Sequence, residues 1–377
     1  MKSIRTLLAA CTLGLSLAAA AQTPVKVGVI LPLSGGAGPQ GQHVTNAIHV
    51  MAAMINDAGG VLGRKIEIVS RDDESTPAVG VSRATELATA GVAVVIEGWN
   101  SPVTLAMQPV LSRAGVLDIT AISKADAILS GEGNPMAVRL NSSNSQDGAV
   151  IANYIATVAK ARRIAFLTQN DAYGNGAQAS IEGELKRLNW AYEKVAEEKF
   201  PFAQADFRVA MTNVRAANPE LTVAINANEG LGMPATIRQA RQSRLPGSFV
   251  AAVGTVAPSV IEVAGDAANG LIGADIYFPA VEPFASNPAN LRFVAKSQEM
   301  HKYTPDKFMA LGATALQVWA MAANELKTLD RAVIAKRIRG GSFKGTVMGD
   351  ISFEPNGQLG SRHYLFTVQN GKIAVQN

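Results

Sequence analysis

The fold of this chain is decided by the segment 25–75, VKVGVILPLSGGAGPQGQHVTNAIHVMAAMINDAGGVLGRKIEIVSRDDES. Its first part, Val25–Leu31, is an almost continuous apolar run, which is typical of a strand buried on both faces of a parallel sheet. A glycine-rich loop follows, then apolar residues at helical spacing, a glycine pair and a second strand at 66–70. Such a strand–helix–strand unit puts its first loop at the carboxyl edge of the sheet, where open α/β folds bind ligands.

The loop contains GAGPQG at 36–41, which matches the G-x-G-x-x-G pattern of dinucleotide-binding folds. In that pattern the glycines follow the strand directly, and an acidic residue for the ribose comes about twenty residues later. Here residues 32–35 intervene, a proline lies within the turn, and Asp72 comes much later. We therefore interpret the loop as a cover for a small ligand, and nucleotide binding is the disfavoured alternative.

Residues 1–21 have the parts of a secretory signal peptide: a basic start, a short apolar stretch and a run of alanines. We expect cleavage after Ala21 and export of the protein to the periplasm. Cys11, the single cysteine of the chain, lies in this segment. Lipoprotein-type cleavage at Cys11 would leave an apolar stretch of only about five residues, shorter than usual, so lipid anchoring is the disfavoured alternative.

The composition favours two globular domains. A chain of 377 residues exceeds one ordinary hydrophobic core, and 48% of its residues are hydrophobic. Loss of Lys2 and Arg5 with the signal peptide would lower the formal net charge from +4 to +2. That charge is too small and too evenly spread to indicate a nucleic-acid or membrane partner.

Strand and helix patterns alternate through the rest of the chain, which indicates two doubly wound parallel sheets of an α/β fold. Asn144 has the position of a helix N-cap and opens a predicted helix that runs to about Lys160. The last segments are β-like, and Asn370-Gly371 predicts a hairpin between two of them. Further strands are expected at 92–96, 116–120, 136–140, 164–168, 192–195, 221–226 and 249–253.

Several motifs occur in the order of one known family. The chain resembles the type I periplasmic binding proteins of the leucine/isoleucine/valine-binding branch, and the resemblance covers essentially the whole sequence after the signal peptide. The motifs that carry it are VGVILPLSG (27–35), INDAGGVLGRK (55–65), DD (72–73), DAYG (171–174), AANP (216–219) and AGDAANG (264–270).

This resemblance implies two lobes joined by three crossing segments, with a ligand enclosed between them. The N-terminal lobe would comprise 25–141 and 275–345, and the C-terminal lobe 142–274 and 346–377. The implied function is capture of a small organic molecule by a monomer that closes like a hinge and delivers it to the permease subunits of an ABC importer. A subunit that presents its ligand to a membrane receptor or sensor kinase would share these features and stays an open alternative.

The residues themselves argue for binding rather than catalysis. Among the four histidines, His43 and His49 are six residues apart, so they fall on different faces of a helix and form no metal pair. The sequence contains no G-x-S-x-G elbow, no H-E-x-x-H motif and no P-loop lysine. The adjacent Asp72 and Asp73 would point to opposite faces of a strand, which suits capping better than catalysis. We therefore predict no enzymatic activity, no cofactor and no metal.

Candidate ligand contacts lie in loops at the carboxyl edges of the predicted sheets. Ser101 precedes Pro102, so it is expected to be an N-cap, and the same helix start offers N–H groups to a carboxylate. Trp99 in this loop is expected to form an apolar wall rather than part of the core. The resemblance implies a ligand-binding serine at Ser101, a closing tyrosine at Tyr173 and a loop contact at Gln40.

Two departures from the family pattern bear on the ligand. Lys124, beside Ser123, occupies a position where the family usually offers threonine, and a solvated surface lysine is the alternative interpretation. After the strand at 249–253 the family has an acid for an α-ammonium, whereas here the residues are GTV at 254–256. Glu229 could substitute from a neighbouring loop, but an unpaired ammonium in a dry cleft is costly, so we expect a small organic acid rather than an α-amino acid. The candidate ligand-binding residues are therefore Gln40, Trp99, Asn100, Ser101, Ser123, Lys124, Tyr173, Asn228, Glu229 and Thr255.

Overall fold

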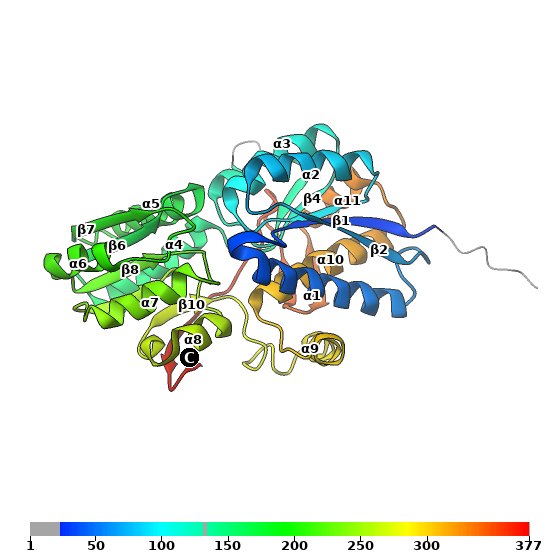
Figure 1. The fold of residues 1–377 in the computed structure, drawn as a ribbon. Coiled ribbons are helices and arrows are strands. Elements are labelled where there is room, and N and C mark those ends of the chain that lie inside the picture. Colours follow the sequence, from blue (N-terminus) through cyan, green and yellow to red (C-terminus); the bar gives the residue numbers. More distant parts are fainter. Residues whose placement is uncertain (1–22, 131–133, 377) are drawn as a thin grey trace, which may run out of the picture.

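The protein consists of two α/β lobes that lie side by side (Figure 1). The computed structural model describes residues 23–130 and 134–376. The predicted signal peptide and Cys11 lie outside the described residues. We call the five-stranded sheet with its helices the N-terminal lobe, and the seven-stranded sheet with its helices the C-terminal lobe.

The N-terminal lobe is built on a parallel sheet with the strand order β2-β1-β3-β4-β5. Its strands are β1 (Val25–Leu31), β2 (Ile66–Asp72), β3 (Val95–Glu97), β4 (Asp118–Thr120) and β5 (Ala137–Arg139). Residues of β1 point alternately to two hydrophobic cores: Ile30 belongs to one, and Val29 and Leu31 belong to the other. Helices therefore cover both faces of the sheet, as the apolar run of β1 predicts.

Helices α2 (Pro77–Thr89) and α3 (Ser101–Arg113) cover one face of this sheet, and α1 (Gly38–Asp57) and α10 (Lys307–Leu326) cover the other. Although α10 comes from a distant part of the chain, it packs beside α1 (Figure 1). Gly312 of α10 allows this close approach, since a Cβ at this position would come 2.6 Å from the side chain of Val44. Two more helices complete the lobe, α9 (Pro288–His301) and α11 (Arg331–Ile338).

The C-terminal lobe is built on a sheet with the strand order β14-β13-β10-β9-β8-β6-β7. The central strands run parallel, and the terminal hairpin adds to β10 in the antiparallel direction. The strands are β6 (Arg163–Gln169), β7 (Glu193–Phe200), β8 (Leu221–Ile225), β9 (Ser248–Ala251), β10 (Ile272–Asp275), β13 (Tyr364–Gln369) and β14 (Lys372–Val375). The helices are α4 (Asn144–Asn153), α5 (Ala172–Arg187), α6 (Arg208–Ala217), α7 (Gly232–Gln242) and α8 (Pro258–Ala264).

The chain passes between the lobes after β5, after β10 and before β13. Before the last passage, β11 (Ser342–Thr346) pairs with β12 (Gly349–Ser352) and contacts α9 and α10. This hairpin spans the boundary expected at 345/346, and we propose that the third crossing follows β12. In that crossing Gln358 accepts a hydrogen bond from Arg139 (2.7 Å) and donates one to the Asn141 carbonyl (2.7 Å), which ties the third crossing to the first.

The predicted architecture of two doubly wound α/β lobes is confirmed, and the differences concern short or charged elements. Sequence patterns do not predict β10, α8 or α11, which are only 4, 7 and 8 residues long. The strand expected at 192–195 extends to Phe200 as β7, because an edge strand tolerates charged residues at its exposed positions. The N-cap of α4 is Ser143 rather than Asn144, and the helix continues beyond Asn153 as a π-helical turn.

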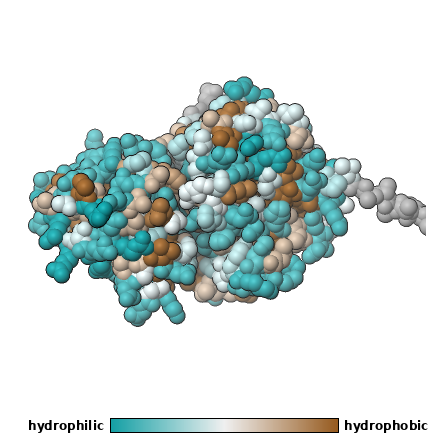
Figure 2. All heavy atoms as spheres, viewed as in Figure 1, coloured by the Kyte–Doolittle hydropathy of each residue, from teal (hydrophilic) through white to brown (hydrophobic). Residues whose placement is uncertain are grey.

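The face of the molecule shown in Figure 2 is mostly hydrophilic, and its hydrophobic side chains form small separate groups. In the ranges 23–130 and 134–376, no helix combines the length and the apolar character needed to span a bilayer. Within the same ranges, His, Cys, Asp and Glu side chains do not gather in groups of three or more that could hold a metal ion.

Candidate ligand-binding site

A cavity lies between the lobes, at the carboxyl ends of their strands. Its lining comes mainly from the loops after β3 and β4 in the N-terminal lobe and after β6, β8 and β9 in the C-terminal lobe. Its volume of about 30 Å³ is roughly two to three times what one water molecule needs, so an organic ligand requires the lobes to part or the lining side chains to move. We call it the cleft cavity. It is lined by Trp99, Asn100, Ser101, Ile122, Lys124, Gln169, Asp171, Tyr173, Ala227, Glu229, Val253, Gly254, Thr255 and Phe308.

Ser101 is the first residue of α3, and its N-cap is Asn100, so the expected N-cap role of Ser101 is wrong by one position. The Ser101 hydroxyl oxygen accepts hydrogen bonds from the backbone N–H groups of Lys124 (3.2 Å) and Ala125 (3.1 Å). Since these bonds occupy the oxygen as an acceptor, the hydroxyl proton can be donated into the cleft cavity. The positive end of the α3 dipole lies at the same point, and this combination suits a carboxylate.

Aromatic and aliphatic side chains form an apolar wall of the cleft cavity. Trp99 and Phe308 lie with their ring centroids 5.0 Å apart and their planes at 42°. Both residues are buried, and Ile122 and Val253 add aliphatic surface. Trp99 lines the cavity and also belongs to the hydrophobic core of the N-terminal lobe, so the expected choice between a ligand wall and the core does not hold. Such a wall suits an apolar or aromatic ligand body.

The C-terminal lobe contributes fixed polar groups after β6. Asp171 caps α5 by accepting a hydrogen bond from the Gly174 N–H (2.9 Å). Gln169 donates to the other carboxylate oxygen of Asp171 and accepts a hydrogen bond from the Ala227 N–H (2.9 Å). Tyr173 follows in α5, and burial raises the pKa of its hydroxyl well above the usual value, so this hydroxyl keeps its proton and can act as a donor.

Lys124 is buried at the cleft cavity rather than solvated, with 6% of its surface exposed. Its ammonium donates hydrogen bonds to the Asp147 carboxylate (2.6 Å), the Val253 carbonyl (2.9 Å) and the Ser142 hydroxyl (3.3 Å). Burial lowers the pKa of Lys124, and Asp147 opposes this effect. Burial would raise the pKa of Asp147, but Lys124 and His363 outweigh it and hold this pKa at about 2. The ammonium thus has a protein acceptor for each of its three protons, so a direct bond to a ligand would have to replace one of them.

Glu229 brings a carboxyl group into the cleft cavity from the loop after β8. The residue is 5% exposed, and within the described part of the chain its Oε2 atom has no hydrogen-bond partner. Burial raises the pKa of Glu229 well above its usual value. A ligand that donates a hydrogen bond here would satisfy this group. Glu229 therefore supplies a carboxyl group that the residues at 254–256 lack, so an α-ammonium would have a partner in the cleft cavity.

Three of the candidate residues lie outside the lining of the cleft cavity. Gln40 lines a separate hollow of about 40 Å³ instead. The Ser123 hydroxyl lies 2.8 Å from the Thr104 hydroxyl in the interior of the N-terminal lobe. Asn228 supports the loop structure, since its side-chain amide donates a hydrogen bond to the Phe202 carbonyl (2.9 Å).

The other candidates line the cleft cavity together. They are Trp99, Asn100, Ser101, Lys124, Tyr173, Glu229 and Thr255. The lining residues that sequence reasoning missed are Ile122, Gln169, Asp171, Ala227, Val253, Gly254 and Phe308. All of these except Phe308 lie at or just after the carboxyl end of a strand. The rule that open α/β folds bind ligands at the carboxyl ends of their strands, applied to every strand, could therefore have found them. Phe308 belongs to α10 and gives no local signal.

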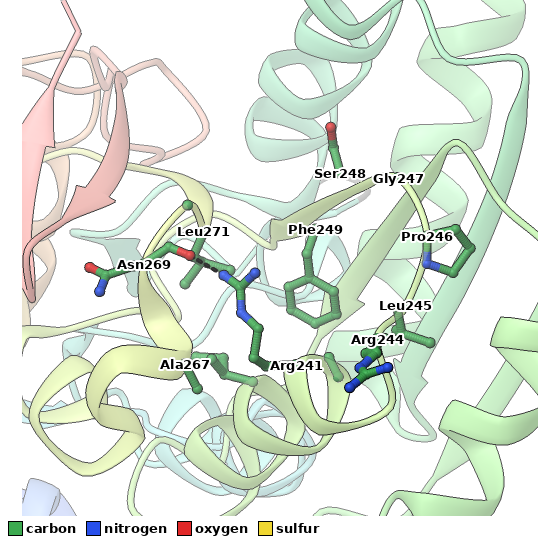
Figure 3. Close-up of a pocket in the computed structure, with 13 residues that line it drawn as sticks. Arg241, Arg244, Leu245, Pro246, Gly247, Ser248, Phe249, Ala267, Asn269 and Leu271 are labelled. Carbon is green, nitrogen blue, oxygen red and sulfur yellow. Dashed lines mark hydrogen bonds between the residues drawn. The ribbon is translucent and has the colours of Figure 1, made fainter.

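A second depression lies on the C-terminal lobe (Figure 3). It is wider, with a volume of about 520 Å³, and is lined by residues of α7 and of the loop before β9. Arg241 donates a hydrogen bond to the Asn269 carbonyl there, and Arg244 is exposed to solvent. Residues before and at the start of β9 line it, so it lies at the edge of the sheet opposite to the one that open α/β folds use for ligands. We therefore assign the candidate site to the cleft cavity.

Comparison with known proteins gives the family. A family model described as periplasmic binding protein matches residues 24–372. The chain belongs to the periplasmic binding protein family. Leu/Ile/Val-binding protein homolog 1 of Brucella suis biovar 1 is 27% identical to this periplasmic binding protein over 334 residues, which are 88% of this chain and 87% of that relative. The Leu/Ile/Val-binding protein of Escherichia coli strain K12 is 27% identical over 335 residues, which are 89% of this chain and 88% of that relative.

Solved structures agree with this assignment. A leucine-binding protein from Thermotoga maritima has a TM-score of 0.83 at 25% identity, covering 94% of this periplasmic binding protein and 98% of that chain. An ABC transporter solute-binding protein from R. palustris in complex with benzoate shares the fold, with a TM-score of 0.82 at 22% identity over 94% of this chain and 95% of that chain. The predicted membership in the type I, leucine/isoleucine/valine-binding branch is confirmed, and so is the prediction of a binding protein rather than an enzyme.

Proposed function

We propose that this protein captures a small carboxylic acid in the cleft cavity and delivers it to an ABC importer. One observation carries the proposal: the cleft cavity combines the donor Ser101, an apolar wall, and a Glu229 carboxyl whose Oε2 has no partner among the described residues. These features complement a ligand with a carboxylate, an apolar body and a hydrogen-bond donor.

In this proposal the ligand carboxylate binds at the start of α3. The Ser101 hydroxyl donates to it, and a charge-assisted hydrogen bond of this kind stabilises a complex by about 1.5–3 kcal/mol. The positive end of the helix adds roughly 0.3–1 kcal/mol. The apolar body packs on Trp99 and Phe308, whose rings form one continuous surface.

The ligand also donates a hydrogen bond to Glu229. An ammonium and a hydroxyl both meet this requirement, so the donor belongs either to an amino acid or to a hydroxylated organic acid. Related proteins support both classes: one from Streptococcus pneumoniae was solved with isoleucine, and one from Rhodopseudomonas palustris with 3,4-dihydroxybenzoic acid. No acid follows β9, but the acid at Glu229 admits an amino acid as well as a hydroxylated organic acid.

Native mass spectrometry of the purified protein tests whether it retains such a ligand. Calorimetry then tests leucine, phenylalanine, benzoate and 3,4-dihydroxybenzoate, each with wild-type protein and with Glu229→Gln. An amino acid should lose about tenfold or more in affinity to Glu229→Gln, because its ammonium loses the charge that it pairs with. A hydroxylated acid should change by less than about threefold, because the amide oxygen still accepts a hydrogen bond.

The exposed Glu67 gives a matched control, since Glu67→Gln should bind as wild type does. If folded protein binds no carboxylic acid of this panel and retains none on purification, the proposed ligand class is wrong. Delivery is tested separately, by uptake of the identified ligand in a strain that lacks the gene. Unchanged uptake with loss of a transcriptional response to the ligand would favour a sensory role instead.

A further inference from the structure

Two lysines of the N-terminal lobe reach the same loop of the C-terminal lobe. Lys124 follows β4, and its Nζ lies 2.9 Å from the Val253 carbonyl oxygen. Lys307 is the first residue of α10, and its Nζ lies 2.7 Å from the Gly254 carbonyl oxygen. Both lysines are buried, with 6% and 3% of their surfaces exposed. Consecutive carbonyl groups after β9 thus accept hydrogen bonds from ammonium groups of the opposite lobe.

Each ammonium also has a carboxylate partner in the C-terminal lobe. The Nζ of Lys124 lies 2.6 Å from the carboxylate of Asp147 on α4. The Nζ of Lys307 lies 3.6 Å from the carboxylate of Asp275, at the end of β10. These carboxylates offset the cost of burying the two positive charges, which would otherwise favour solvent. Each lysine therefore makes a main-chain contact and an ionic contact with elements of the other lobe.

The loop after β9 is adapted to this approach at Gly254. Its φ angle of +73° is one that glycine adopts readily and other residues rarely do. A Cβ at this position would lie only 2.2 Å from the Nζ of Lys307 and 3.2 Å from that of Lys124. Any larger residue would press on both ammonium groups, so glycine is what lets both lysines reach the backbone.

From this geometry we infer that Lys124 and Lys307 form a latch that holds the loop 253–255 against the N-terminal lobe. The latch joins protein atoms only, so it stabilises the closed arrangement whatever the ligand is. The same loop lines the cleft cavity, which makes the two lysines positioning residues for the C-terminal side of the site. The inference rests on the proposed function in one respect, that the closed arrangement is the one that holds ligand.

Separation of the lobes would take both ammonium groups away from their carbonyl partners. A charge-assisted hydrogen bond is strong enough that loss of one lysine should shift the open–closed equilibrium of the free protein by about tenfold toward the open form. Affinity for any ligand falls with the fraction of protein in the binding-competent form. Lys124→Met and Lys307→Met should therefore both weaken binding. Because Lys124 also lines the cleft cavity and Lys307 does not, Lys307→Met is the variant that separates the latch from a direct ligand contact.

Distances between two spin labels test the latch in free protein. The single native cysteine is replaced by Cys11→Ser, and labels are attached through Gln42→Cys on α1 and Leu231→Cys before α7, both at exposed positions. We expect each lysine variant to increase the ratio of long to short distances by about tenfold over the parent protein. Lys336→Met, at an exposed lysine of α11, is the matched control and should leave the ratio unchanged.

Gly254→Ala gives an independent disruption, because it keeps both lysines and displaces them by steric contact. It should open the protein as the lysine variants do, and thermal unfolding confirms that each variant is folded. Parent-like distances in Lys124→Met, Lys307→Met and Gly254→Ala would overturn the latch. Shifted distances in a protein that binds no carboxylic acid would support the latch and count against the proposed function alone.

Discussion

Two buried carboxyl groups in the N-terminal lobe should make the stability of the protein depend on pH. Glu97 and Asp118 lie on the neighbouring strands β3 and β4 and are fully buried. Glu97 accepts hydrogen bonds from the hydroxyl groups of Thr120 (2.6 Å) and Thr104 (2.8 Å). Burial raises the pKa of Glu97 to about 7, and burial together with the charge of Glu97 raises the pKa of Asp118 well above its usual value.

The sign of the effect follows from the direction of these shifts. Because the pKa of Glu97 in the folded protein lies above its ordinary value of 4.5, the folded protein binds this proton more tightly than the unfolded chain does. The resulting stabilisation is complete below pH 4.5 and is lost as the pH rises through about 7. At about 1.4 kcal/mol per pKa unit, this loss amounts to about 3 kcal/mol in the free energy of unfolding.

Urea denaturation between about pH 5 and about pH 8 measures this loss. The variant Glu97→Gln keeps the shape of the side chain but has no titratable group at this position. Across this pH range the free energy of unfolding of the wild type should therefore fall by about 2–3 kcal/mol more than that of Glu97→Gln. The exposed Glu67→Gln should follow wild type at every pH. If the difference in the free energy of unfolding between wild type and Glu97→Gln stays constant with pH, burial does not raise the pKa of Glu97 in the folded protein.

Three further predictions concern the ligand and the packing. Ser101→Ala should weaken ligand binding about tenfold or more in calorimetry, because the hydroxyl that donates to the carboxylate is lost. Ser101→Thr keeps this hydroxyl and should retain binding. Equal affinity of Ser101→Ala and wild type would mean that the carboxylate binds elsewhere. Gly312→Ala should lower the free energy of unfolding in urea by about 1–3 kcal/mol, because its Cβ would lie 2.6 Å from Val44; an unchanged midpoint would contradict the tight packing of α1 on α10. Ligand should compact the protein in small-angle scattering as the lobes close, and unchanged scattering despite confirmed binding would exclude the hinge.

Much of the fold could be predicted because buried parallel strands leave a strong local pattern. β1 and β8 are apolar apart from one residue each, Lys26 and Thr222, and each strand is almost entirely buried. β10 could not be predicted from such a pattern, because its four residues, IGAD, contain only one large apolar side chain. The apolar pattern of α10 predicts a buried helix but says nothing of its partner, which depends on contact between Gly312 and Val44.

The candidate site could be predicted only in part, for a related reason. Trp99 and Ser101 follow β3 closely, so the rule that ligands bind at the carboxyl ends of strands leads to them. The surroundings of Lys124 could not be predicted, because Asp147 and Val253 come from two other elements and no spacing in the sequence relates them. Whether a buried lysine faces a ligand or an aspartate is a tertiary property.

Neither lobe is continuous in the sequence. The N-terminal lobe needs α10, which carries the fully buried Trp319, and the C-terminal sheet is completed by β13 and β14 near the end of the chain. Domains form as units during synthesis, so both cores stay incomplete until almost the whole polypeptide has emerged from the ribosome. For a chain that begins with a predicted export signal, this layout postpones completion of both cores until late in synthesis, which favours transport of the polypeptide before it folds.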